Sequence, residues 1–134
     1  MNESLQVKGK KRFSVIARIK SATHAWRGVM LLFKTTHNAW LHLFFAFLVV
    51  CLGFFFSISH AEWLAIVFAI GIVIVAEAFN TAIEIDIDLT SPEYHPYARD
   101  TKDVAAGAVL LAAIMAAIIG IIIFLPKIFN CLNL

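Results

Sequence analysis

Three long apolar stretches dominate the chain, and each is close to the length that a helix needs to cross a bilayer. They cover residues 39–59, 63–83 and 104–125. A helix rises about 1.5 Å per residue, so roughly 20 apolar residues cross the ~30 Å of hydrocarbon in a membrane. The sequence therefore predicts an all-α integral membrane protein with three transmembrane helices, in a single domain over residues 1–134.

A different periodicity precedes the first apolar stretch. Between residues 12 and 35, apolar positions recur every three or four residues: Phe13, Ile16, Ile19, Ala22, Trp26, Met30 and Phe33. Basic residues lie between them, which is typical of an amphipathic helix in the membrane interface with its cations near anionic headgroups. Such a helix anchors the protein and sets its topology, or contacts the substrate directly, and both roles can hold. Residues 1–11 are polar and unpatterned, so we expect a tail there.

Composition agrees with a membrane protein, and the charges give its orientation. Hydrophobic residues make up 61% of the chain and charged residues 15%, and the mean hydropathy is +0.86. Eight of the eleven Lys and Arg residues precede the first apolar stretch, whereas the turn after it holds Glu62 and no Lys or Arg. By the positive-inside rule, the N-terminus and the connection over 85–103 are cytoplasmic. We therefore expect the excess of basic residues to lie near the anionic headgroups of the membrane surface, and we predict no nucleic-acid partner.

Ionisable groups appear in the second apolar stretch before it ends. At about 100° per residue, one third of the helix circumference carries Glu77, Asn80, Thr81, Glu84 and Asp88. Asp86 points to the opposite side, so we exclude it. At membrane depth a neutral or partnered Glu77 is favoured, so the carboxylate form of this residue is suited to accept a proton from an alcohol. Glu84 and Asp88, nearer to water, are suited to hold a hard cation such as Mg²⁺. Alternatively, these groups only satisfy one another and neighbouring helices.

The connection after this helix is either a plain loop or a ligand-binding segment. Residues 89–103 combine turn formers with both signs of charge. Thr101 or Asp103 is a candidate cap of the third helix, and Lys102 lies near the positive N-terminus of that helix, where phosphate is favoured. No GxxxxGK[ST] phosphate loop occurs, so a bound nucleotide would need a clamp of carboxylates and metal.

Small residues recur along the third stretch. Ala108, Ala112, Ala116 and Gly120 form a ridge at intervals of four, on which we expect close packing of a helix from the same chain or from another copy. Pro126 is expected to end the helix.

These polar motifs resemble the signature of the prokaryotic diacylglycerol kinase and undecaprenol kinase family. The resemblance rests on Glu77-Ala-Phe-Asn80-Thr-Ala-Ile-Glu84-Ile-Asp-Ile-Asp88, Glu93-Tyr94-His95-Pro96 and Lys102-Asp103-Val-Ala-Ala-Gly-Ala-Val. The three-span layout with an amphipathic N-terminal helix extends it over nearly the whole chain. It implies a homotrimer in the bacterial inner membrane, with ATP sites at the cytoplasmic surface built from adjacent subunits.

The resemblance also implies roles for individual residues. Glu77 resembles the general base toward the lipid hydroxyl, and Glu84 resembles the metal-binding glutamate. Asn80 and Lys102 correspond to groups that contact the nucleotide phosphates, and the residues near the nucleotide are Asp88, Glu93, His95 and Asp103. The implied co-substrate is ATP, the cofactor is Mg²⁺, and the acceptor is a membrane lipid alcohol, diacylglycerol or undecaprenol.

One position departs from the family pattern. Family members often carry a metal-binding glutamate before the first span, and Thr36 stands in that place. This leaves three alternatives: either Thr36 holds a metal-bound water, or another carboxylate substitutes for the glutamate, or metal affinity and turnover are reduced.

The sequence as a whole predicts an ATP-dependent lipid kinase. The Ala-Ala-Gly-Ala-Val stretch after Asp103, together with Asn38 and His42, resembles the undecaprenol-type branch. A nucleotide-binding pseudokinase is one alternative. A small oligomeric transporter subunit, with Glu77 as an ion or proton site, is another. A membrane lipid phosphatase is disfavoured because the chain lacks an Arg-rich or His-nucleophile pattern.

Overall fold

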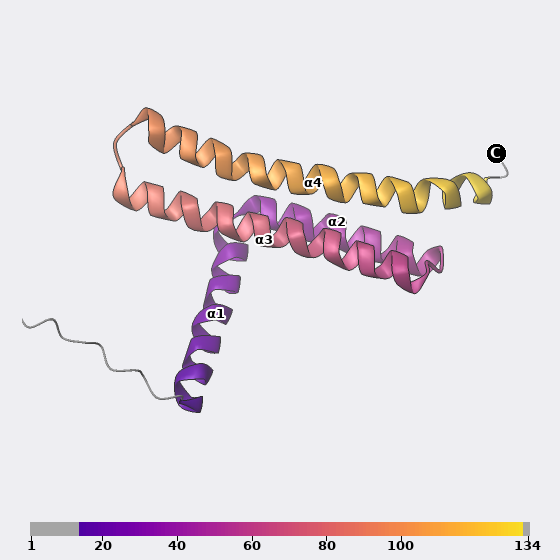
Figure 1. Ribbon diagram of the computed structural model, residues 1–134, viewed down its shortest axis with the longest axis horizontal. Coiled ribbons are helices and arrows are strands. Elements are labelled where there is room, and N and C mark those ends of the chain that lie inside the picture. The colour runs from indigo at the N-terminus through magenta and orange to yellow at the C-terminus, as the bar shows by residue number, and fades with distance from the viewer. Residues whose placement is uncertain (1–13, 133–134) are drawn as a thin grey trace, which may run out of the picture.

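The computed structural model describes residues 14–132, and within that range it consists of helices joined by short connections (Figure 1). The predicted tail over 1–11 lies outside the described residues. The helices are α1 (Val15–Thr35), α2 (His37–Phe55), α3 (His60–Thr90) and α4 (Pro96–Cys131). Figure 1 shows α2, α3 and α4 running alongside one another, with α1 leaving one end of α2 crosswise. We call this end of the bundle the α1 end and the opposite one the far end.

Three of these helices are long and apolar enough to cross a membrane, namely α2, α3 and α4. This confirms the predicted all-α membrane fold with three apolar helices. With 31 and 36 residues, α3 and α4 measure about 46 and 54 Å, which exceeds the ~30 Å of hydrocarbon. At the α1 end, the last turns of α3 and the first turns of α4 extend beyond the start of α2 (Figure 1). The connection between them therefore projects out of the apolar layer.

Helix ends differ from the predicted apolar stretches because local hydrogen bonds decide them. The stretch over 39–59 is cut short, since α2 ends at Phe55 and Ser57 adopts a left-handed φ of 48° in the turn that follows. Ser59 then caps α3. Its hydroxyl accepts a hydrogen bond from the Glu62 N–H at 3.3 Å, and its own N–H donates to the Glu62 carboxylate at 2.7 Å, forming a capping box.

The start of α4 lies eight residues before the predicted stretch. Pro96 occupies the first turn, where its missing N–H is no loss. Nδ1 of His95 accepts a hydrogen bond from the Tyr97 N–H at 3.3 Å and so caps the helix. The prediction that Thr101 or Asp103 caps it was therefore wrong.

Pro126 lies inside α4, which continues to Cys131. The prediction that this proline ends the helix was wrong. A proline removes one backbone hydrogen bond, and helices packed in a membrane tolerate that loss.

The buried face of α4 matches the predicted ridge of small residues fully only at Ala112. Its buried residues include Ala105, Val109 and Ala112, whereas Ala108 is exposed. Positions spaced by four rotate about 40° around a helix at every step, so such a ridge drifts off a straight neighbour. The spacing of four and then three keeps the buried positions facing α3. Ala116 and Gly120 are only half-buried.

Two ion pairs tie α3 and α4 together at opposite ends. At the far end, Lys127 Nζ lies 2.9 Å from a carboxylate oxygen of Glu62, beside a buried cluster made of Ile58, Ile66, Ile123 and Phe124. At the α1 end, Lys102 pairs with Asp88. These pairs define an antiparallel register in which Glu77 lies at the level of Ala112 and Ala113.

Candidate active site

Three polar side chains of α3 are buried at one level of the bundle. Glu77 is 1% exposed, Asn80 5% and Thr81 6%. Among the described residues, neither carboxylate oxygen of Glu77 nor Oδ1 of Asn80 finds a hydrogen-bond partner. A buried polar group without a partner costs about 1–3 kcal/mol. Buried polar atoms in native structures take their partners from protein, water or a ligand.

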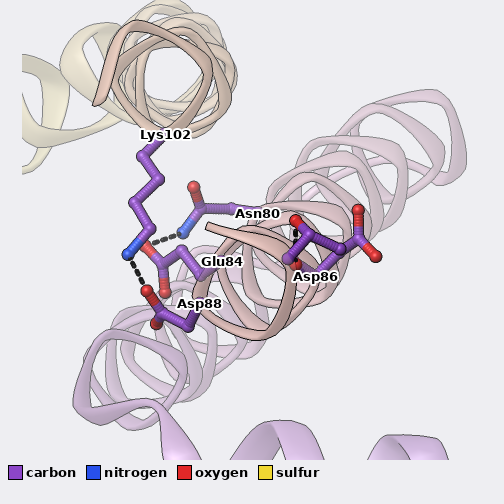
Figure 2. A network of polar contacts seen from close by, with 6 residues as sticks. Asn80, Glu84, Asp86, Asp88 and Lys102 are labelled. Carbon is purple, nitrogen blue, oxygen red and sulfur yellow. Dashed lines mark hydrogen bonds and ion pairs between the residues drawn. The ribbon is translucent and has the colours of Figure 1, made fainter. Parts of the chain in front are cut away.

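A row of polar contacts continues from this cluster toward the α1 end (Figure 2). Nδ2 of Asn80 donates to a carboxylate oxygen of Glu84 at 2.9 Å, which fixes the orientation of the amide. One turn further, Asp88 forms an ion pair with Lys102 of α4. Figure 2 shows Asp86 on the opposite side of α3 from Glu84 and Asp88, as helical geometry predicts. Asn80, Glu84 and Asp88 of the predicted stripe therefore lie on one side of α3, where Lys102 of α4 adds a cation.

Exposure to water rises along this row. Glu77 is buried, whereas the side chains of Asp88 and Lys102 are 68% and 34% exposed. At 1.5 Å per residue, the backbone of Glu77 lies about 16 Å from that of Asp88 along α3. The row thus joins a carboxyl group at membrane depth to a cation near the water.

A hydroxyl pair links the junction of α1 and α2 to this site. The hydroxyl oxygens of Thr36 and Thr81 lie 3.0 Å apart, and the Thr81 hydroxyl donates to the backbone carbonyl of Glu77 at 2.9 Å. Since Thr81 uses its proton in that bond, Thr36 donates to Thr81. Thr36 is the residue between the two helices and makes no side-chain cap bond to α2. The position where the family pattern has a glutamate therefore lies one turn from Glu77, a contact that no local signal in the sequence reveals.

Three predicted nucleotide-binding residues lie apart from this row. His95 caps α4. Asp103 pairs with Arg99 at 3.4 Å on the exposed side of α4. Glu93 is exposed in the connection between α3 and α4. No hydrogen bond or ion pair within residues 14–132 joins these three to Glu84, and their role near a nucleotide stays a prediction.

The oxygen donors of the row suit a magnesium ion that arrives with a nucleotide. Glu84 has a second carboxylate oxygen, and Oδ1 of Asn80 is unpartnered. In the part of the chain that the structure describes, no group of three or more His, Cys, Asp or Glu side chains could hold a metal. Mg²⁺ commonly binds through one or two carboxylates together with substrate phosphates. The residues present therefore fit a metal shared with phosphates.

Comparison with known proteins identifies the family to which the chain belongs. Residues 23–124 match the family described as prokaryotic diacylglycerol kinase, so the chain belongs to this family and the protein is a lipid kinase, as the sequence motifs predict. It is similar to an undecaprenol kinase of Bacillus subtilis (strain 168), with 42% identity over 108 residues that cover 81% of this chain and 88% of that protein. It is also similar to a diacylglycerol kinase of Synechocystis, with 40% identity over 111 residues that cover 82% of this chain and 63% of that protein.

Proposed function

We propose that the protein transfers the γ-phosphoryl group of ATP to the hydroxyl of a membrane lipid alcohol at the α1 end of the bundle, and that this end faces the bacterial cytoplasm. The observation that carries the proposal is the buried carboxyl group of Glu77, which no described residue satisfies. It lies on the same face of α3 as Asn80 and Glu84, which lead from membrane depth toward the partly exposed Lys102.

The proposed reaction needs one proton acceptor at membrane depth. The lipid hydroxyl reaches Glu77 from the bilayer, and Glu77 takes its proton as the oxygen attacks the γ-phosphorus of ATP. The bond from that phosphorus to the bridging oxygen breaks, and ADP leaves with the electron pair. A positioned general base contributes about 10²–10⁴ to such a rate.

The remaining residues of the row hold and neutralise phosphate. Lys102, kept near the α1 end by Asp88, supplies a cation for the phosphate oxygens. Glu84 and Oδ1 of Asn80 would hold Mg²⁺, which supplies neutralisation of the charge that develops on the phosphoryl group. Because phosphoryl transfer requires mainly alignment and charge stabilisation, so small a set of residues is sufficient.

The acceptor is undecaprenol or diacylglycerol, because one relative named above is an undecaprenol kinase and the other is a diacylglycerol kinase. A homotrimer in the inner membrane is part of the proposal, because a neighbouring subunit would supply groups for a site whose buried atoms lack partners in one chain. Thr36 favours a second candidate function, namely nucleotide binding without turnover, since one carboxylate fewer than the family pattern is available for metal.

The experiment is transfer of labelled phosphate from Mg-ATP to undecaprenol or diacylglycerol, with the purified protein in mixed micelles. We expect Glu77→Gln to lower the rate by about 10²–10⁴. Asp86→Asn is the matched control, because it makes the same change on the opposite side of α3 and should leave the rate unaltered. A folded Glu77→Gln variant with the wild-type rate would refute the assignment of the base. Wild-type protein that binds ATP and labels neither lipid would favour the pseudokinase.

A further inference from the structure

Thr36 stands between α1 and α2 and directs its hydroxyl to α3 instead of to its own helix. A threonine at the N-cap of a helix ordinarily accepts a hydrogen bond from a backbone N–H two or three residues further on. Thr36 occupies this position of α2 and makes no such bond. Its hydroxyl oxygen lies 3.0 Å from that of Thr81 and 3.5 Å from that of Thr35. The Thr35 hydroxyl donates to the Leu31 carbonyl within α1, so the contact with Thr81 is the one that joins two helices.

The junction that carries Thr36 is held by contacts of both helices. Nε1 of Trp40 in α2 donates to the backbone carbonyl of Phe33 in α1 at 2.7 Å, and the two rings meet edge to face with their centroids 5.7 Å apart. About one turn to either side of Thr36, Leu32 and Ala39 are 5% and 0% exposed. A hydrogen bond is stronger where water is excluded, and the loss of one partner there leaves the other unsatisfied. The Thr36 hydroxyl is therefore held at a defined place against α3.

The bond from Thr36 reaches the candidate base through the backbone of α3. The Thr81 hydroxyl is buried and donates to the backbone carbonyl of Glu77 at 2.9 Å. Two hydrogen bonds in series thus lead from Thr36 to the turn that carries Glu77. Within the described residues no hydrogen bond holds the Glu77 carboxyl group itself, so its place depends on its backbone and packing. A general base must lie within hydrogen-bond reach of the hydroxyl, and a misplacement of about 1 Å costs up to about 10²-fold in rate.

We propose that Thr36 is a positioning residue of the phosphoryl transfer, which holds Glu77 within reach of the lipid hydroxyl by way of Thr81. The inference rests on the proposed function and adds a residue to it. The hydroxyl of Thr36 is the group that matters, because it is the donor to Thr81. Its effect falls on the transfer step and therefore on kcat. The KM for ATP should not depend on it, since Lys102 and Glu84 lie further toward the water.

Substitutions of similar shape separate the hydroxyl of Thr36 from the rest of its side chain. Thr36→Val removes the hydroxyl and keeps the shape, whereas Thr36→Ser keeps the hydroxyl. Thr35→Val is the matched control, since this neighbouring threonine is exposed and its hydroxyl bonds to the backbone of its own helix. Thr81→Val removes the acceptor of the same bond and serves as a second variant if Thr36→Val fails to fold.

Initial rates of phosphate transfer from labelled Mg-ATP are measured in mixed micelles with undecaprenol and with diacylglycerol. We expect Thr36→Val to lower kcat by roughly 3–10-fold, the factor that corresponds to one ordinary hydrogen bond, with the KM for ATP unchanged. Thr36→Ser should retain most of the wild-type kcat, and Thr35→Val should behave as the wild type. The double variant of Thr36→Val and Thr81→Val should have the kcat of Thr81→Val alone, because no bond between the two residues is left to remove.

Three results would overturn the inference while leaving the kinase function intact. The first is a wild-type kcat in Thr36→Val, with or without a rise in the KM for ATP. The second is a kcat in Thr36→Ser as low as that in Thr36→Val, which would show that the hydroxyl is not the group that matters. The third is a double variant in which the two losses of kcat multiply, which would show that Thr36 and Thr81 act independently. Wild-type protein that transfers phosphate to neither lipid would refute the proposed function itself, and this inference with it.

Discussion

Replacing Gly53 with alanine tests how closely α2 and α3 approach at the far end. Gly53 is buried, and a Cβ there would lie 2.7 Å from Cη2 and 2.9 Å from Cζ2 of Trp63, and 3.2 Å from Cδ1 of Ile58. Carbon atoms in contact prefer about 3.5–4.0 Å. The indole ring also packs against Phe54, with ring centroids 5.0 Å apart. The ring can therefore make room only by disturbing that pair or the buried cluster around Ile58.

Two opposing effects set the magnitude of the change. An overpacked core typically loses about 1–3 kcal/mol, and alanine in place of glycine in a helix regains up to about 1 kcal/mol. We expect Gly53→Ala to lower the free energy of unfolding by about 1–2 kcal/mol, which changes the ratio of folded to unfolded protein by a factor of roughly 5–30.

Equilibrium unfolding in mixed micelles of rising SDS content, followed by circular dichroism, measures this change. Gly71→Ala is the control, because a Cβ at that position meets nothing within 4 Å and only the helix preference remains. Trp63→Leu should remove most of the penalty when combined with Gly53→Ala. A Gly53→Ala variant as stable as Gly71→Ala would refute the reasoning.

Three other contacts give further predictions. Thr36→Glu restores the carboxylate of the family pattern and should lower the Mg²⁺ concentration for half-maximal transfer by roughly tenfold; an unchanged Mg²⁺ titration would contradict this. Lys102→Met should reduce kcat/KM for ATP by roughly 10–100-fold through loss of a charged contact to phosphate, whereas Arg99→Met, which removes an exposed cation three residues away, should not. Lys127→Met removes the ion pair that joins Lys127 Nζ to Glu62 at 2.9 Å and should lower the free energy of unfolding in mixed micelles by up to about 1 kcal/mol; stability equal to that of the wild type would contradict this.

Features that depend on one helix alone were accessible from the sequence. Hydropathy gave three membrane helices, and the rotation of about 100° per residue placed Glu84 and Asp88 on one face of α3 with Asp86 on the other, as Figure 2 shows. Both properties follow from the identity of nearby residues.

Features that depend on two helices were not accessible. The contact of Thr36 with Thr81 joins residues 45 positions apart, and the pair of Lys102 with Asp88 requires the register of α3 against α4. The cap of α4 was misassigned because several polar residues in the connection can cap a helix, and the hydrogen bond from the Tyr97 N–H to His95 selects the one before Pro96. The apolar space of about 570 Å³ between α2, α3 and α4 requires the relative placement of three helices.

The crosswise direction of α1 has a consequence for membranes of different thickness. A bilayer that holds the three apolar helices upright places α1 along its surface (Figure 1). Thr36, between α1 and α2, is hydrogen-bonded to Thr81, one turn from Glu77. The depth of Glu77 is therefore fixed relative to the leaflet surface on which α1 lies, because Glu77 is only about 6 Å along α3 from Thr81. A thicker or thinner bilayer would be accommodated at the far end, by the turn after α2 and the last turns of α4, and the place where the lipid hydroxyl meets the carboxyl group would not move.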